Sequence, residues 1–164
     1  MTNENHKIKS IYNYILDHNS EDSDFWSMGG GSNEIQKKLN TFLDEDWSNL
    51  KTEIVKWDND YIDIILVSIT FGFDGMFVPC LHERLIPNAG NFLLDMFIFL
   101  DNFDQKYEIA FNSFFINTSN SNKISELKLM KNWMIENGFN KKEWLNLNIN
   151  PLKNIIEAIN KTST

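Results

Sequence analysis

The fold is decided by residues 88–117, which read NAGNFLLDMFIFLDNFDQKYEIAFNSFFIN. Apolar side chains recur in the first arm at the three- and four-residue spacing of a helix face, at Phe92, Leu93, Met96, Phe97 and Leu100. A second stripe follows at Tyr107, Phe111, Phe114 and Phe115. The stripes are separated by Asp101-Asn102-Phe103-Asp104, and Asp is a favoured N-cap residue. The sequence therefore predicts two apolar helices joined by a tight turn, with Asp104 capping the second. Two buried strands are the alternative, but each arm is long for a strand and lacks alternation.

Similar patterns on both sides of this stretch predict an all-α fold of about eight helices. The expected helices cover residues 6–18, 32–43, 44–57, 61–71, 88–100, 104–117, 123–137 and 151–160. Residues 62–71 are rich in β-branched side chains, which leaves a strand open there. Only 7 Gly and 3 Pro occur in the chain, too few for the many turns of a β-sandwich.

A faint internal repeat supports stacked helical hairpins. The dipeptide Asp58-Asn59 lies between two expected helices and recurs 43 residues later as Asp101-Asn102. HEAT and armadillo repeats have periods of roughly 40–47 residues. Successive apolar hairpins must bury their faces on each other, so they stack. We therefore predict a single domain over residues 1–164, built from antiparallel hairpins in a HEAT/armadillo-like arrangement.

The charge of the chain is acidic and uneven. The formal net charge is −8, and residues 17–63 hold twelve Asp and Glu against four Lys. Nucleic-acid binders need basic surfaces that displace counterions, so the composition argues against a nucleic-acid partner. It argues equally against an anionic membrane surface. An acidic surface suits a basic protein partner, although solubility alone also explains the charge.

The composition predicts a cytoplasmic protein. Cys80 is the one cysteine in the sequence, so the chain forms no internal disulfide, which fits a reducing compartment. The first residues, MTNENHKIK, lack the apolar core of a signal peptide. No apolar run reaches the roughly 18 residues that span a bilayer.

No motif for a catalytic, cofactor or metal site is recognisable. His82-Glu83 begins like a zinc-protease helix, but Ile86 stands where the second histidine is needed. Residues 29–31 are three glycines without the Lys-Ser/Thr of a phosphate loop, and we expect a flexible joint. The acidic runs at 44–46 and 58–60 lack the spacing of a calcium loop and are interpreted as helix caps.

Two interpretations apply to the tryptophans. Trp47, Trp57 and Trp133 match apolar stripes and are expected in the core. Trp26 belongs to no stripe and lies between acidic residues and the three glycines. It is either an exposed binding anchor, since Trp is favoured at interface hot spots, or a lid that folds back on the core.

The chain resembles the HEAT-like helical immunity proteins of bacterial polymorphic and contact-dependent toxin systems. The resemblance covers residues 32–117 and rests on the expected hairpins and on Trp47…Trp57-Asp58-Asn59. It implies a non-enzymatic protein without cofactor or metal, which binds a cognate toxin domain, often a basic nuclease, and masks it. The residues we expect to bind that partner are Asp22, Asp24, Trp26, Asp44, Glu45, Asp46, Asp60 and Asp63.

Two other functions compete with this one. The first is an adaptor or structural protein that oligomerises through its apolar helices; the oligomeric state is left open by the sequence. The second is a small enzyme in which Cys80 and His82, with Glu83 and Arg84 nearby, line a cleft.

Overall fold

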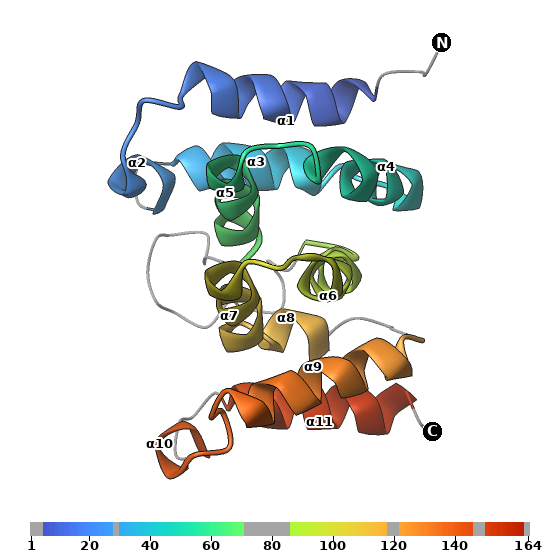
Figure 1. Ribbon diagram of the computed structural model, residues 1–164. Helices are drawn as coiled ribbons and strands as arrows, with labels where there is room; N and C mark the ends of the chain where they lie inside the picture. The colour runs from blue at the N-terminus through green and yellow to red at the C-terminus, as the bar shows by residue number, and fades with distance from the viewer. Residues whose placement is uncertain (1–4, 28–29, 71–85, 118–121, 146–149, 163–164) are drawn as a thin grey trace. The chain divides into compact units, whose positions relative to one another are not determined.

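A computed structural model of the chain describes residues 5–27, 30–70, 86–117, 122–145 and 150–162. Over these residues the fold is all-α, with eleven helices and no strand (Figure 1). The helices are α1 His6–Asp17, α2 Ser23–Ser27, α3 Gly31–Leu39, α4 Asp44–Ile54, α5 Asn59–Thr70, α6 Ala89–Phe99, α7 Phe103–Phe111, α8 Phe114–Asn117, α9 Ile124–Glu136, α10 Lys142–Leu145 and α11 Pro151–Thr162. Helices α2, α8 and α10 have only four or five residues. The other eight correspond to the helices expected from the sequence.

The chain divides into two compact units, Met1–Pro87 and Asn88–Thr164, which we call unit 1 and unit 2. The division falls at the start of the apolar stretch that dominates the sequence. The single domain over residues 1–164 and the HEAT/armadillo-like stacking stay predictions. Each unit has its own buried core and is described separately below.

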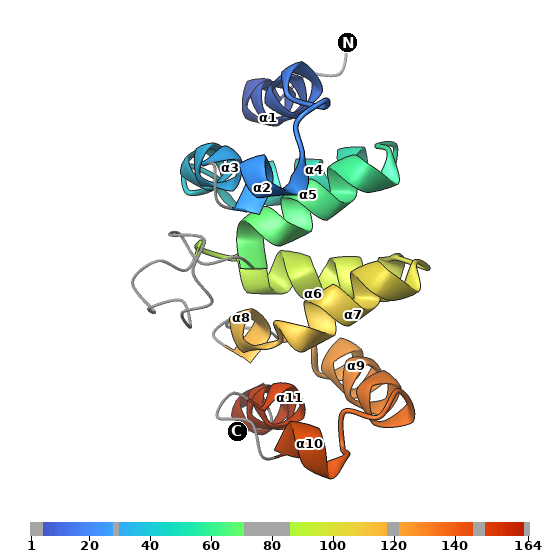
Figure 2. The ribbon, with the colours of Figure 1, turned by 90° about the vertical axis from the view of Figure 1, so that its left-hand side faces the viewer.

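Unit 1 is built around α5, whose choice between helix and strand is now settled as helix up to Thr70. This helix packs on α2 and α3, while α1 packs on α3 and α4. Figure 2 views α3 end-on and shows α5 running across it. A polar link joins the two helices inside the core: the Gln36 amide donates to the Ser68 carbonyl oxygen at 2.7 Å. The apolar core of this unit includes Ile11, Ile15, Ile35, Leu39, Leu50, Ile54, Ile65 and Leu66, all at most 1% exposed.

Of the three glycines expected to form a flexible joint, Gly31 is a close-packed position, whereas Gly29 lies outside the described residues. Gly31 begins α3, directly beneath the aromatic pair of α2. A Cβ atom at Gly31 would lie 2.7 Å from Cε1 of Phe25 and 2.8 Å from Cε3 of Trp26. Real Cβ atoms do not approach other atoms so closely, so the glycine is required for α2 to lie on α3.

We expect Gly31→Ala to destabilise unit 1 by roughly 1–3 kcal/mol, because the added methyl overpacks the contact with Phe25 and Trp26. The intrinsic helix preference of alanine, worth about 1 kcal/mol, offsets part of this cost. Urea unfolding measures the change. Asn33→Ala, two residues further along α3, is the matched control and should change the free energy of unfolding by less than about 0.5 kcal/mol. A Gly31→Ala variant as stable as the wild type would contradict the packing.

Unit 2 is built around α6, which packs on α7, α8 and α9, while α11 packs on α8 and α9. In Figure 1, α9 and α11 lie side by side. Helix α9 ends at the predicted place. Gly138, at φ 88°, lets the Phe139 N–H reach the Met134 carbonyl at 2.9 Å, which closes the helix with a Schellman motif. The fully buried side chains of this unit include Leu93, Leu94, Met96, Ile109, Ile116, Leu127, Met130, Met134, Phe139 and Ile155.

The apolar hairpin at the start of unit 2 differs from the prediction in two details. The second arm is capped by Asn102, whose side-chain oxygen accepts the Gln105 N–H at 3.1 Å, so Asp104 lies inside the first turn. The arm also breaks at Ser113, whose hydroxyl donates to the Pro151 carbonyl oxygen at 2.7 Å and ties the turn to α11. Asp95, the acidic residue inside the first arm, pairs with Lys123.

Candidate interaction surface

The negative charge of the protein belongs entirely to unit 1. Residues 1–87 hold fifteen Asp and Glu against seven Lys and Arg, whereas residues 88–164 hold eight of each. Unit 1 therefore carries the whole formal charge of −8, and unit 2 is neutral. Any function that depends on negative potential is a property of unit 1.

The acidic residues predicted to bind a partner lie in three separate groups on unit 1. Asp22 and Asp24 lie at the N-terminus of α2, where the Asp22 carboxylate accepts the Phe25 N–H at 3.1 Å. Residues 44–46 form the first turn of α4. Asp60 and Asp63 lie on α5. Figure 1 shows α2 and α4 at opposite ends of unit 1, with α5 between them, so the three groups do not form one patch. All except Asp46 are exposed.

Trp26 is a core residue and not an exposed anchor. Only 7% of it is exposed. Its ring lies edge-on to Phe25, 5.0 Å between centroids, and edge-on to Tyr14 at 6.1 Å. The lid interpretation is therefore correct. Trp26 lacks a helical stripe because α2 is only five residues long, and its burial comes from contacts with α1 and Gly31.

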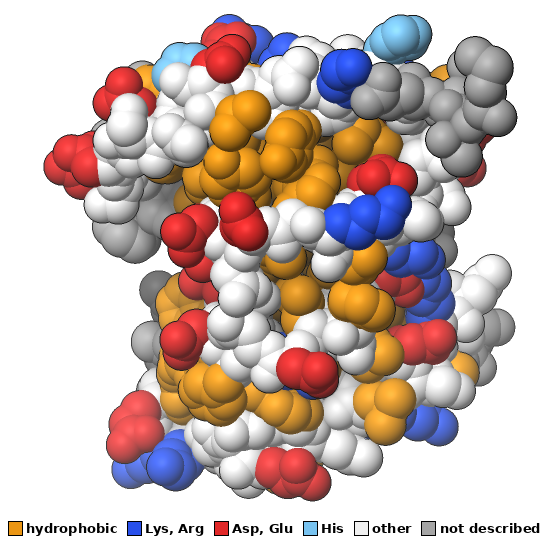
Figure 3. Space-filling model, turned by 45° about the horizontal axis from the view of Figure 1, so that its top comes forward, with side chains coloured by type: hydrophobic (Ala, Val, Ile, Leu, Met, Phe, Trp, Pro, Cys, Tyr) orange, Lys and Arg blue, Asp and Glu red, His pale blue; other side chains and the backbone are white. Residues whose placement is uncertain are grey.

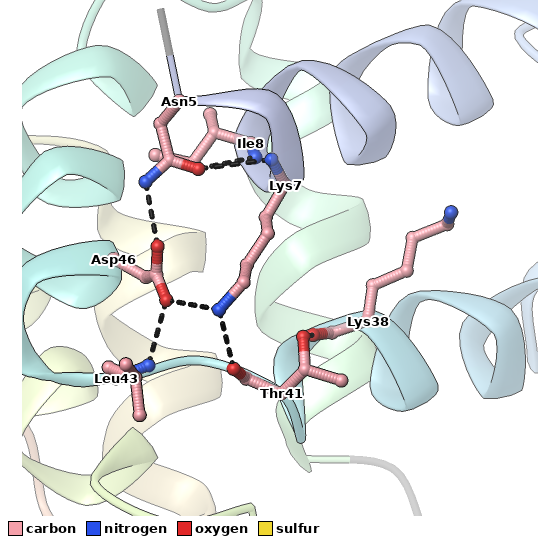
Figure 4. Close-up of polar contacts among 7 residues, drawn as sticks. All are labelled: Asn5, Lys7, Ile8, Lys38, Thr41, Leu43 and Asp46. Atoms are coloured by element: carbon pink, nitrogen blue, oxygen red, sulfur yellow. Dashed lines mark hydrogen bonds and ion pairs between the residues drawn. The ribbon is translucent and has the colours of Figure 1, made fainter. Parts of the chain in front are cut away.

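Asp46 is buried, unlike the other acidic residues predicted to bind a partner, and it has a structural role. It is 8% exposed and joins the N-terminus of α1 to that of α4 (Figure 4). Its carboxylate accepts from the Asn5 amide at 2.7 Å, from the Lys7 ammonium at 2.6 Å and from the Leu43 N–H at 2.8 Å. The same ammonium donates to the Thr41 carbonyl oxygen at 2.7 Å. As predicted from the acidic run, Asp46 thus caps the first turn of α4.

The network also changes the acidity of Asp46. Burial by itself raises the pKa of this carboxyl group, since it disfavours the charged form. The hydrogen bonds from Leu43, Lys7 and Asn5, together with the charge of Lys7, outweigh burial and lower the pKa to about 2. Asp46 is therefore ionised throughout the physiological pH range.

Three aromatic rings form a half-buried patch on unit 1, and one of them, Trp57, was expected in the core. The Tyr12 ring of α1 lies 5.1 Å from the Trp57 ring and 5.7 Å from the Tyr61 ring of α5, between centroids. All three side chains are partly exposed, unlike Trp47, which is 6% exposed as expected for a core residue. We call these three residues the Tyr12 patch. Figure 3 shows one face on which hydrophobic side chains reach the surface beside carboxylates.

Backbone hydrogen bonds hold the segment that carries two rings of the Tyr12 patch, and acidic side chains lie beside it. The Trp57 N–H donates to the Ile54 carbonyl at the end of α4, and the Tyr61 N–H donates to the Asp58 carbonyl, each at 3.0 Å. Exposed Asp58 therefore lies on the turn between Trp57 and Tyr61, and exposed Asp60 lies in the first turn of α5. Half-exposed Tyr and Trp side chains beside carboxylates can bury apolar area and pair with Arg or Lys in a single contact.

Other kinds of site receive less support from the described residues. Among them, no three His, Cys, Asp or Glu side chains gather where they could hold a metal ion. Within the same residues, no helix combines the length and apolar character needed to span a bilayer. Cys80, His82, Glu83 and Arg84, the candidate residues of the alternative enzyme, lie outside the described part of the chain.

Comparisons with protein-family models, with curated proteins and with solved structures returned no match for this chain.

Proposed function

We propose that this protein binds a basic protein partner through unit 1 and neutralises it, as an immunity protein neutralises a cognate toxin domain. The proposed contact is the Tyr12 patch together with Asp58 and Asp60. The observation that carries the proposal is this combination of half-exposed aromatic rings and exposed carboxylates, in the unit that holds all of the net charge.

The geometry of the patch suits protein recognition. Trp, Tyr and Arg dominate the energetics of protein interfaces, and they do so near the centre of the contact, where water is excluded. The Tyr12 ring packs against both the Trp57 and the Tyr61 ring, so these side chains lose little entropy when a partner covers them. Asp58 and Asp60 at the edge then select a partner with Arg or Lys opposite them, because like charges there would repel.

The other exposed acidic residues contribute to partner binding through long-range electrostatic attraction. Asp22 and Asp24 on α2, Asp44 and Glu45 on α4, and Asp63 on α5 add to the negative potential of unit 1. A potential of this kind speeds the encounter with a basic partner and is weakened by salt. The proposed mechanism is therefore steric masking with electrostatic steering, without a reactive group.

We expect Trp57→Ala to weaken partner binding by at least roughly 2 kcal/mol, or about 30-fold in Kd, because it removes the largest ring of the patch. The partner to use is the protein encoded immediately upstream of this reading frame. Calorimetry measures its binding, and growth of bacteria that express it alone or with this chain measures neutralisation. If the upstream protein is harmless and does not bind this chain, the proposed function is wrong.

A pair of charge variants with equal changes in net charge tests where the contact lies. Asp60→Lys, beside the patch, should weaken binding by roughly tenfold. Glu136→Lys, at the end of α9 in unit 2, should change it by less than about twofold, since it leaves the charge of unit 1 unchanged. Equal losses for both variants would place the effect in the overall charge and argue against the Tyr12 patch.

A further inference from the structure

Helix α7 of unit 2 presents an aromatic stripe to the surface. Phe103, Tyr107 and Phe111 follow one another at four-residue spacing, and we call them the α7 stripe. Phe103 is 54% exposed and Phe111 is 46% exposed, with Tyr107 half-buried between them. Phe99, at the end of α6, is 58% exposed. Soluble domains seldom leave several phenylalanines this exposed on neighbouring elements unless the surface binds something.

A rigid aromatic layer supports the stripe. Each of its rings lies against a ring from α9, from the turn after α9 or from α10. The centroid distances are 5.6 Å for Phe103–Trp133, 5.2 Å for Tyr107–Phe139 and 5.6 Å for Phe111–Trp144. Phe139 and Trp144 stack at 4.8 Å. The exposed rings are thus fixed before any partner arrives, which reduces the entropy cost of binding.

The charges beside the stripe have opposite signs at its two ends. Asp101 and Asp104 are exposed at the N-terminal end, next to Phe103. Lys141 and Lys142 are exposed near Trp144, the ring that contacts Phe111 at the other end, and exposed Glu143 lies between Lys142 and Trp144. Within the described residues, neither the two aspartates nor the two lysines form an ion pair with another side chain. One end of the stripe is therefore acidic, and the other has a net positive charge.

We propose that the α7 stripe binds the same stripe of a second copy of this chain, with the two α7 helices antiparallel about a twofold axis near Tyr107. In a twofold contact each residue of one copy meets the reciprocal residue of the other. Reversal of the helix sets Phe103 against Phe111 of the second copy and the acidic end against the basic end. The neutral charge of unit 2 permits such a contact, whereas two copies of acidic unit 1 repel each other.

The size of the patch predicts a weak dimer. A Phe side chain buries about 150–250 Å² when fully covered, so the exposed halves of Phe99, Phe103 and Phe111 supply roughly 300 Å² in each copy. Stable interfaces bury about 800 Å² per partner, and smaller ones are weak. We therefore expect a dimer with a Kd on the order of 100 μM, which forms without the partner of unit 1.

Sedimentation velocity of the full chain, from about 1 μM to about 1 mM, tests the proposal. We expect the mass to rise from one copy to two across this range. Phe103→Ser combined with Phe111→Ser should raise the Kd at least about tenfold. Leu129→Ser, at a 57% exposed position on α9, is the matched control and should leave the Kd unchanged. A chain that stays monomeric throughout, or a dimer indifferent to the two Phe variants, would overturn the proposal.

A charge exchange tests the antiparallel register and leaves the aromatic rings in place. Asp104→Lys alone sets lysine against Lys142 of the second copy, and Lys142→Glu alone sets glutamate against its Asp104. Each single change should raise the Kd by about threefold to tenfold, and the double variant should restore it. Singles without effect, or a double variant no better than the singles, would exclude this register. Circular dichroism confirms that each variant is folded.

Discussion

Replacing Phe139 with alanine is expected to lower the free energy of unfolding of unit 2 by about 3–5 kcal/mol. Phe139 is fully buried, and its ring contacts those of Tyr107, Trp133 and Trp144. Alanine would remove the centre of this aromatic group and leave a cavity that helices on several sides cannot close. The measurement is urea unfolding, with amide hydrogen exchange of α9 and α11 as the local report on unit 2.

Two controls separate burial from aromatic character. Phe139→Leu keeps most of the volume and should cost less than about 1.5 kcal/mol. Phe99→Ala removes the same atoms from a 58% exposed site and should cost less than about 1 kcal/mol. If Phe99→Ala and Phe139→Ala destabilise the protein equally, the arrangement of the aromatic layer beneath the α7 stripe is wrong.

The sequence predicted the helices well because their burial follows local periodicity. In α1 the structure buries Ile8, Ile11 and Ile15, which lie on one face of the helix, as their spacing predicts. In α5 the run of β-branched residues left a strand open, and packing on α2 and α3 favoured the helix. Periodicity contains no information on where a short helix breaks, which is why α7 and α8 were predicted as one helix and α2 as a loop.

The candidate site was predicted less well, because exposure depends on contacts between elements. Trp57 matches an apolar stripe and yet lies half-exposed on the turn before α5. Trp26 matches no stripe and is buried. Trp26 is buried because Gly31 allows α2 to pack closely on α3. The sequence does not indicate this contact, because a run of three glycines is equally compatible with a hinge. The acidic character of unit 1, by contrast, is visible in the sequence alone.

Asp46 shows the same limit for charged residues. The run at residues 44–46 predicts negative charge at a helix N-terminus, and all three residues lie there. What distinguishes Asp46 from its neighbours is Lys7, which lies 39 residues earlier in the chain and reaches it only in the folded unit. A local sequence pattern cannot identify that contact. The same role was therefore predicted for all three residues, although Asp46 has a different one.

We expect Asp46→Asn to lower the free energy of unfolding of unit 1 by about 1–2 kcal/mol at neutral pH. The substitution keeps the shape of the side chain, but its amide group donates where the Asn5 amide and the Lys7 ammonium also donate. The side chain of Lys7 is 39% exposed, so solvent screens part of the interaction. Glu53→Gln, in the exposed pair with Lys56, is the matched control and should cost less than about 0.5 kcal/mol.

The pH dependence of the same variant identifies the cause. The Asp46 carboxyl has a pKa of about 2 in the folded chain and an ordinary value of 3.8. A pKa that is lower in the folded state stabilises the fold above the unfolded value, and the stabilisation disappears as pH falls through the folded value. The stability difference between wild type and Asp46→Asn should therefore be constant above about pH 5 and shrink between about pH 4 and pH 2. Urea unfolding across this range measures it, and a difference that persists unchanged at pH 2 would mean that shape, and not charge, joins α1 to α4.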